Sequence, residues 1–154
     1  IFYDISKAYD TVRWSSIERA LIRLGAPKAL VDFVIQSLEG TTLSMKTGTT
    51  GGQTKAVQIH KAIKQGCPLA PLLFVIMMDE LHKGYRKIGG YTMPDGTLVS
   101  SRGYCDDTVI LAGGLPTLRA MNTWTSKFFA AHGMGLNATK STVTGRHRDG
   151  TDRL

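Results

Sequence analysis

The sequence predicts one α+β domain, an antiparallel sheet with helices packed largely on one face. Segments with apolar residues at helical spacing alternate along the chain with short β-branched segments. Glycines and prolines separate these segments at positions typical of turns. No internal repeat or linker divides the 154 residues, so residues 1–154 are expected to form a single domain.

The first third of the chain predicts one strand and two helices. Residues 1–5 are apolar and β-prone and end at a polar turn, which indicates a strand. One helix is expected from a Ser15 or Ser16 cap to Gly25, and a second from Pro27 to Gly40. The expected buried face of the second helix consists of Leu30, Phe33, Val34 and Leu38.

The rest of the chain predicts two more helices and several short strands. Residues 41–63 alternate β-branched and polar residues around a glycine turn at 48, 51 and 52, which favours two antiparallel strands. Residues 69–87 predict a long helix, buried in its first half because it is apolar nearly all round. Residues 115–132 predict an amphipathic helix with Leu118, Met121, Thr125, Phe128 and Phe129 on one face, and short β-like pieces follow at 136–137 and 141–144.

Two adjacent acids, Asp106 and Asp107, interrupt an otherwise apolar or β-prone stretch. Residues 98–99 lead toward them and residues 108–111 leave them, so the carboxylates are expected at the turn of a β-hairpin. Like charges repel and burial disfavours both ionised forms, and a bound divalent cation would remove that cost. Carboxylate oxygens suit Mg²⁺. For this pair alone, the alternative is an exposed acidic turn.

Asp4 is a third candidate carboxylate, at the end of the first predicted strand. If that strand lies beside the acidic hairpin, Asp4 and Asp106 can face each other. Two metals ~3.5–4 Å apart could then be held between them, one at an attacking hydroxyl and one at a leaving phosphate oxygen. Taken alone, an Asp at a strand end is more often a cap or turn residue.

Composition narrows the class of protein but does not define it. Nineteen Lys plus Arg against twelve Asp plus Glu give a net charge of +7, which favours a polyanionic partner. The two cysteines have no paired ligand spacing, so a structural zinc site is not expected. The longest apolar run is too short to span a bilayer, and no membrane partner is expected. The chain opens without Met inside an apolar run and resembles a piece of a longer protein.

Four segments occur in an order that resembles the successive palm motifs of reverse transcriptases. They are Asp4-Ile5-Ser6-Lys7-Ala8-Tyr9-Asp10, Gln65-Gly66-Cys67-Pro68-Leu69-Ala70-Pro71-Leu72-Leu73-Phe74, Tyr104-Cys105-Asp106-Asp107 and Gly135-Leu136-Asn137-Ala138-Thr139-Lys140. The second is most similar to those of LINE-type (non-LTR) retrotransposons. The resemblance runs from residue 1 to about residue 144 and implies an RNA-directed DNA polymerase palm.

The resemblance implies roles for individual residues. Two Mg²⁺ ions, or Mn²⁺, would be held by Asp4, Asp106, the Ile5 carbonyl and, less directly, Asp107. Tyr9 would be an aromatic steric gate that favours deoxynucleotides, and Gln65 and Gly66 would lie against the nascent base pair. Lys140 would lie near the pyrophosphate, with a solvated surface lysine as the alternative.

Three positions depart from the family pattern. Ala70 stands where Ser is common, Val75 where Asn is usual, and Cys105 where Ala is common. Val75 is expected to remove a polar group from a buried helix. None of the three is a proposed metal ligand.

The resemblance also implies missing parts and partners. The N-terminal part of the fingers and the thumb are absent from this sequence, so the isolated fragment is expected to be inactive. The partners implied are template RNA, a DNA primer or target, and dNTP, and the localisation implied is nuclear. Three other hypotheses compete with this one. The first is a retroelement remnant or RNA-binding palm without turnover. The second is a viral-type RNA polymerase, which Tyr9 and Cys105 disfavour, and the third is a group II intron-type maturase, a near relative.

Overall fold

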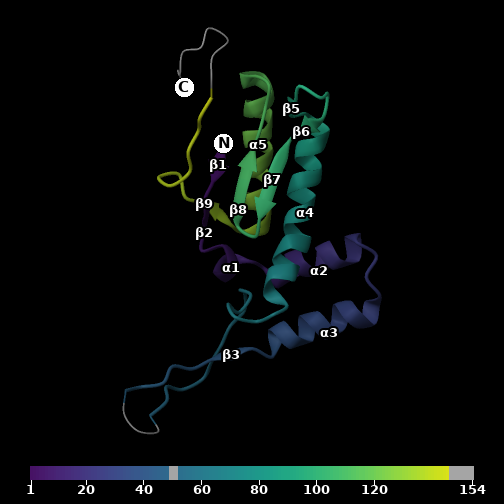
Figure 1. The fold of residues 1–154 in the computed structure, drawn as a ribbon. Helices are drawn as coiled ribbons and strands as arrows, with labels where there is room; N and C mark the ends of the chain where they lie inside the picture. The colour runs from purple at the N-terminus through teal and green to yellow at the C-terminus, as the bar shows by residue number, and fades with distance from the viewer. Residues whose placement is uncertain (49–51, 146–154) are drawn as a thin grey trace.

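A computed structural model describes residues 1–48 and 52–145 of the chain (Figure 1). Its helices are α1 (Ala8–Thr11), α2 (Trp14–Arg23), α3 (Lys28–Glu39), α4 (Ala70–Ile88) and α5 (Leu115–His132). Its strands are β1 (Phe2–Tyr3), β2 (Ile5–Ser6), β3 (Thr42–Leu43), β4 (Val57–Gln58), β5 (Tyr91–Thr92), β6 (Leu98–Val99), β7 (Ser101–Tyr104), β8 (Asp107–Ile110) and β9 (Gly135–Leu136).

The largest sheet among the described residues is antiparallel, with strand order β1-β8-β7. β7 and β8 form a hairpin, and β1 joins the other side of β8 through the pairs Phe2–Val109 and Tyr3–Thr108. β2 pairs with β9, β3 with β4, and β5 with β6. The fold is therefore α+β with small antiparallel sheets, as the sequence predicts.

α4 is the central helix of the core. It packs against α2, α5 and β7 (Figure 1), and its buried side chains include Leu73, Phe74, Met77, Leu81 and Tyr85. At Gly84, α4 lies directly against α5: an added Cβ atom would lie 2.2 Å from the Trp124 Nε1 atom. Only glycine leaves room for the indole ring at this crossing.

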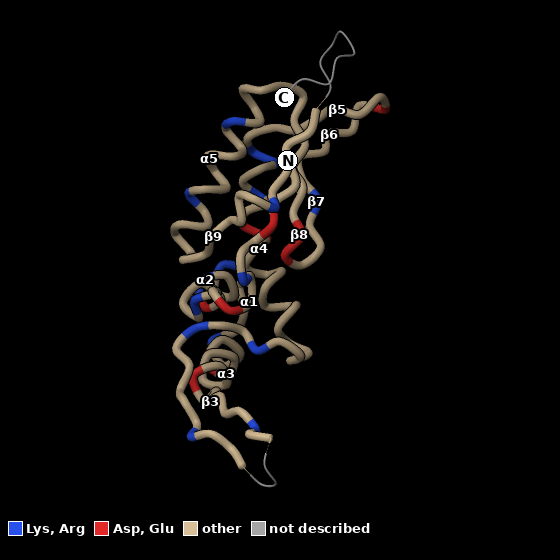
Figure 2. The backbone as a smooth tube through the Cα atoms, turned by 90° about the vertical axis from the view of Figure 1, so that its left-hand side faces the viewer, with Lys and Arg blue, Asp and Glu red and all other residues tan. Residues whose placement is uncertain are grey.

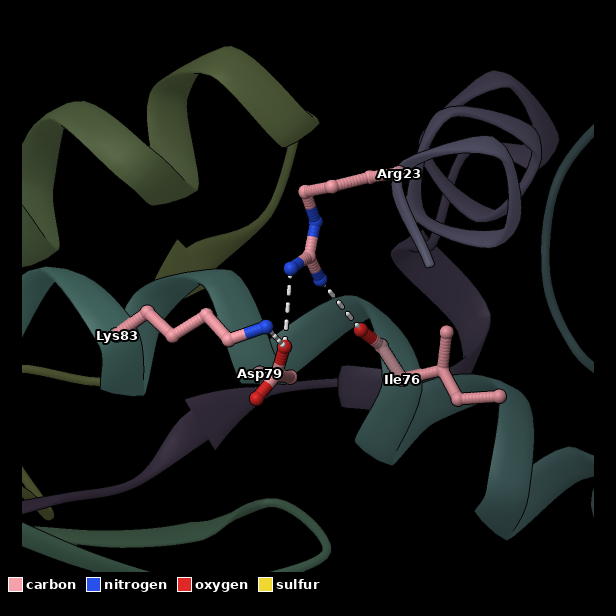
Figure 3. A network of polar contacts seen from close by, with 4 residues as sticks. All are labelled: Arg23, Ile76, Asp79 and Lys83. Atoms are coloured by element: carbon pink, nitrogen blue, oxygen red, sulfur yellow. Dashed lines mark hydrogen bonds and ion pairs between the residues drawn. The ribbon is translucent and has the colours of Figure 1, made fainter. Parts of the chain in front are cut away.

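A polar network joins α2 to α4 at the edge of this core (Figure 3). The Arg23 guanidinium lies 2.9 Å from the Asp79 carboxylate and donates a 3.2 Å hydrogen bond to the Ile76 carbonyl. Lys83 lies 2.7 Å from the same carboxylate. Partial burial acts to raise the pKa of Asp79, but the hydrogen bonds and charges of Lys83 and Arg23 together hold it below its usual range.

Several predicted elements are confirmed, and their bounds differ by a residue or two. α3 begins directly after Pro27 and ends at Gly40, and α5 covers residues 115–132 as predicted. The first predicted strand is divided at Asp4 into β1 and β2, because the two halves pair with different partners. α2 begins at Trp14, ahead of the expected serine caps. The predicted turn at 48, 51 and 52 lies partly outside the described residues, and the predicted strand at 141–144 is a single bridge between Phe2 and Thr142.

Three expectations about burial and pairing are wrong. Of the predicted buried face of α3, Val34 is buried and Leu38 is partly buried, but Leu30 and Phe33 are exposed, because packing on α2 turns Val31 inward instead. Val75 is 49% exposed and lies beside β7, so it takes no polar group out of the core. Residues 98–99 form β6, which pairs with β5, and β7 is the strand that leads into the acidic turn.

Among the described helices, none has the length and apolar character needed to cross a bilayer.

Candidate active site

The acidic pair lies at the turn of the β7–β8 hairpin, as predicted. Tyr104 and Asp107 form the last pair of the ladder, which leaves Cys105 and Asp106 as a two-residue turn. The backbone of Cys105 has φ 53°, the left-handed conformation that tight hairpin turns require. Because side chains other than Gly, Asn and Asp rarely adopt this conformation, Cys105 is a strained residue directly beside the acid.

Asp4 follows β1 at the same end of the sheet. The β1–β8 register, continued by one residue beyond the Tyr3–Thr108 pair, brings Asp4 to the level of Asp107, with Asp106 one residue further along. On its other side, the backbone N–H of Asp4 donates to the Ser141 Oγ at 3.2 Å, and its carbonyl accepts from the Asn137 N–H at 2.9 Å. The backbone of Asp4 is therefore fixed between the acidic hairpin and the segment after β9.

The three carboxylates have no protein partner within the part of the chain that the structure describes. Asp4 and Asp106 are partly buried and Asp107 is exposed, and none forms a hydrogen bond or ion pair through its side chain there. No group of three or more His, Cys, Asp and Glu residues among residues 1–48 and 52–145 forms a closed metal site. The three acids lie at one end of the sheet, but their side chains do not surround a common metal position.

Tyr9 connects three of the four sequence motifs. It lies in α1, and its ring stacks on Phe74 of α4 with centroids 5.0 Å apart and an interplanar angle of 23°. Burial raises the pKa of Tyr9 to about 12, and neighbouring Cys105 and Asp106 act in the same direction. The phenol is therefore protonated at neutral pH beside the acidic turn.

The Gln65-Gly66 loop lies next to α1. The Cys67 N–H donates to the Lys64 carbonyl at 3.1 Å, and Gly66 has φ +84°, which together indicate a type II turn with both central residues exposed. Just before this turn, the Ile63 N–H donates to the Tyr9 carbonyl at 2.9 Å. The loop is thus anchored directly to the residue that stacks on Phe74.

Ile5 lies within the β2–β9 pair, and Lys140 lies in the turn that follows β9. Ile5 is buried and pairs with Leu136, so the chain passes from Asp4 directly into the second small sheet. Lys140 is exposed in the turn between Asn137 and Ser141, the two residues that hold the Asp4 backbone. Lys140 therefore lies in a turn that is bonded to Asp4, and its ammonium group has no partner among the described residues.

Sequence reasoning missed the residues that support this site. Ser141 and Asn137 hold Asp4 through backbone contacts, and no composition or spacing signal marks such contacts. Below β1, the Tyr85 hydroxyl lies 2.7 Å from the Thr125 Oγ1, which donates to the Tyr3 hydroxyl at 3.3 Å. Thr125 lies on the predicted apolar face of α5, and a hydroxyl at such a position is a signal for a buried polar network.

The fold and site thus define an α+β domain with an acidic hairpin and a neighbouring strand-end acid. Over residues 1–149 the chain matches the family described as reverse transcriptase (RNA-dependent DNA polymerase). The chain belongs to this family of RNA-directed DNA polymerases, and its relatives are non-LTR retrotransposon proteins.

Three relatives show the extent of the similarity. The chain is 35% identical over 142 residues to a retrovirus-related Pol polyprotein from type-1 retrotransposable element R2 of Popillia japonica, covering 90% of this chain and 19% of the relative. A second such polyprotein from Popillia japonica is 31% identical over 150 residues, covering 93% and 24%. The polyprotein from type-2 element R2DM of Drosophila melanogaster is 31% identical over 142 residues, covering 92% and 13%. The chain spans about a fifth of the length of the first relative.

The carboxylates have the chemistry that a Mg²⁺ ion in a polymerase needs. Mg²⁺ is typically bound through one or two carboxylates and keeps water and substrate phosphates in the rest of its shell. Unpaired acids that are exposed or partly exposed at one end of the sheet suit such binding better than a closed set of protein ligands would. The donor set therefore fits the group that the family uses.

Proposed function

We propose that this chain is the palm of an RNA-directed DNA polymerase that joins a dNTP to a primer 3′-hydroxyl on an RNA template. The observation that carries the proposal is the pairing of β1 with β8, which brings the strand end at Asp4 to the acidic turn. Asp4, Asp106, the Ile5 carbonyl and, less directly, Asp107 would hold two Mg²⁺ ions. Bound there, the ions would polarise the attacking hydroxyl and the leaving phosphate oxygen.

The other residues would orient the substrates. The Tyr9 ring, held flat by its stack on Phe74, would lie beneath the sugar and exclude a 2′-hydroxyl. Gln65 and Gly66 are exposed beside Tyr9 and would lie against the nascent base pair. Lys140 would lie toward the pyrophosphate, where its positive charge offsets the charge that develops on the leaving group.

We propose further that the site works as part of a larger protein. The carboxylates are partly exposed, and an open site leaves their charges screened by water. We therefore propose that the isolated chain is inactive and that the grip on the triphosphate and on the primer–template duplex comes from outside residues 1–154. The relatives are retrotransposon proteins, and copying at chromosomal DNA implies a nuclear location and a DNA primer or target.

The proposal is tested by primer extension with the full-length protein that contains this chain. A primed RNA template and dNTPs are supplied, and Asp106→Asn is compared with the wild type. Replacing the acid removes one charge from the site and keeps its shape, so we expect the rate to fall by about 10²–10³-fold or more. Asp32→Asn is the matched control, because among the described residues Asp32 pairs only with the exposed Lys28 on α3.

Equal extension by the Asp106→Asn and wild-type proteins would remove the catalytic assignment. A wild-type protein that binds the primed template but never extends the primer would instead support a palm without turnover. Extension that depends on a primed RNA template and is unaffected by Asp32→Asn would confirm the proposal.

A further inference from the structure

One exposed hairpin of the chain carries lysines and no acidic residue. From residue 40 to residue 78 the sequence contains Lys46, Lys55, Lys61 and Lys64 and no acidic residue. Residues 41–48 and 52–61, here called the basic arm, include β3 and β4 and extend away from α3 in Figure 1. In Figure 2 the arm carries only lysine colour, whereas α3 beside it carries both signs.

The charges of the basic arm are available to a partner. Lys46, Lys55 and Lys61 are all exposed, and none forms an ion pair with any residue in the described part of the chain. Unpaired surface lysines attract phosphates by charge and gain further from counterion release when a nucleic acid binds. On α4, acidic residues accompany the cations, and Lys83 is already paired with Asp79.

The arm also exposes apolar side chains that have no core to join. Leu43, Met45 and Val57 are 56%, 65% and 63% exposed. β3 and β4 form a two-stranded sheet on their own, and an isolated hairpin of this kind is marginally stable without a partner. Lysines interspersed with apolar side chains suit a single nucleic-acid strand, which offers both phosphates and unpaired bases.

The shape of the arm is set by a bulge in its ladder. Thr42 pairs with Gln58 and Leu43 with Val57, but Lys46 bridges to Gln53. Residues 54–56 therefore lie opposite only residues 44–45, and a 2.8 Å bond from the Thr54 N–H to the Met45 carbonyl closes the bulge. Bulges bend a ribbon and increase its twist, which curves the exposed surface.

The base of the arm is fixed to the candidate active site. The Ala62 N–H donates to the Val12 carbonyl, and the Trp14 Nε1 donates to the Ala62 carbonyl at 2.8 Å. Ala62 has φ 93°, a strained conformation that these contacts maintain. The next residue, Ile63, is bonded to Tyr9, so the arm leads directly to the Tyr9 and Gln65 region.

We propose that the basic arm binds the single-stranded part of the template RNA that has not yet been copied. This inference rests on the proposed polymerase function. The copied strand is in a duplex, and only the template ahead of the active site is single-stranded. A strand that reaches Gln65 along the arm would meet Lys46, Lys55 and Lys61 on the way and Lys64 at the turn.

The test measures binding without catalysis in the full-length protein. The probes are a primed RNA template with a single-stranded 5′ overhang of about 16 nucleotides, enough for one binding site, and the same primed duplex with a blunt end. In the triple variant K46Q/K55Q/K61Q, affinity for the overhang probe is expected to fall about tenfold or more near 0.1 M salt. The slope of log affinity against log salt should become shallower by about 2, since each phosphate contact to a single strand contributes about 0.7. Affinity for the blunt probe should not change.

The matched control is K87Q/R119Q/K127Q, which removes three exposed cations from α4 and α5. It should bind both probes like the wild type, with a thermal midpoint like that of the arm variant. Equal loss on both probes, or no loss on either, would overturn the inference. These binding results can be obtained whether or not the protein extends a primer. Failure of the proposal about the basic arm can therefore be told apart from failure of the polymerase assignment.

Discussion

The sheet with α4 and α5 differs from the basic arm in how its residues are held. Tyr3, directly before Asp4, is paired with β8, the Asp4 backbone is bonded to Asn137 and Ser141, and the core side chains of α4 are buried. The described residues of the arm are held by its own two strands and by its base. The comparison indicates that catalytic side chains need several contacts to hold them in place. A surface that attracts a charged nucleic-acid strand needs only exposed charge.

Filling the helix crossing should have the largest effect on stability. In Gly84→Ala the new Cβ would lie 2.2 Å from the Trp124 Nε1, which donates to the Leu81 carbonyl. Overpacking of this kind costs about 3 kcal/mol. For a chain of this size the thermal midpoint should fall by about 6–12 °C, measured by circular dichroism.

The arm offers the matched control for this substitution. A Cβ at Gly48 would meet nothing within 4 Å, so Gly48→Ala should leave the midpoint within about 2 °C of the wild type. Similar losses from both substitutions would show that the arm is as tightly packed as the helix crossing. The proposed difference between the two regions would then be wrong.

Removing one buried hydroxyl should have a smaller effect. The Thr125 Oγ1 lies 2.7 Å from the Tyr85 hydroxyl and 3.3 Å from the Tyr3 hydroxyl, and all three side chains are buried. Thr125→Val keeps the shape and leaves a buried Tyr85 hydroxyl without this partner, which costs about 2 kcal/mol. Urea denaturation should show a lower midpoint with an unchanged slope.

Thr123→Val is the control for this substitution. The Thr123 hydroxyl is exposed and bonds only to the Arg119 carbonyl one turn earlier, so its loss should change stability by less than about 0.5 kcal/mol. Because Tyr3 lies in β1, Thr125→Val should also loosen the strand before Asp4. Faster amide exchange at Tyr3 in that variant alone would support this link, and equal destabilisation by both variants would contradict it.

The sequence predicts the elements of this chain better than their faces. α3 and α5 are found from Pro27, Gly40 and the apolar spacing before His132, because caps and periodicity are local signals. The exposed face of α3 could not be found in this way. Phe33 is 64% exposed because helix packing selects Val31 and Val34, and that choice depends on α2.

The candidate site shows the same limit. The acidic turn and the nearness of β1 to β8 follow from motifs and order along the chain. The strained turn at Cys105, the Tyr9–Phe74 stack and the hold of Ser141 on Asp4 are tertiary contacts between distant residues. No pattern within one segment encodes them. The metal ligands, the steric gate and the role of Lys140 stay predictions.

The pH dependence of stability should show the smallest effect, and His132 is the residue to test. Its ring lies 4.2 Å from that of Phe128, and no described residue bonds its buried Nδ1 atom. Burial, with help from Arg19 and Arg13, holds the pKa of His132 below the ordinary histidine value of 6.5, while Glu80 acts in the opposite direction. The unfolded chain therefore binds the proton more tightly than the folded chain.

This difference in proton affinity stabilises the folded chain at neutral pH. The contribution of His132 is fully present above pH 6.5, the ordinary pKa, and is lost as the pH falls through the lower pKa of the folded state. His132→Phe removes the titrating group and keeps an aromatic ring. Between about pH 7.5 and about pH 5 the thermal midpoint of this variant should therefore fall less than that of the wild type. Parallel losses in the two proteins would show that His132 carries no proton linkage to folding.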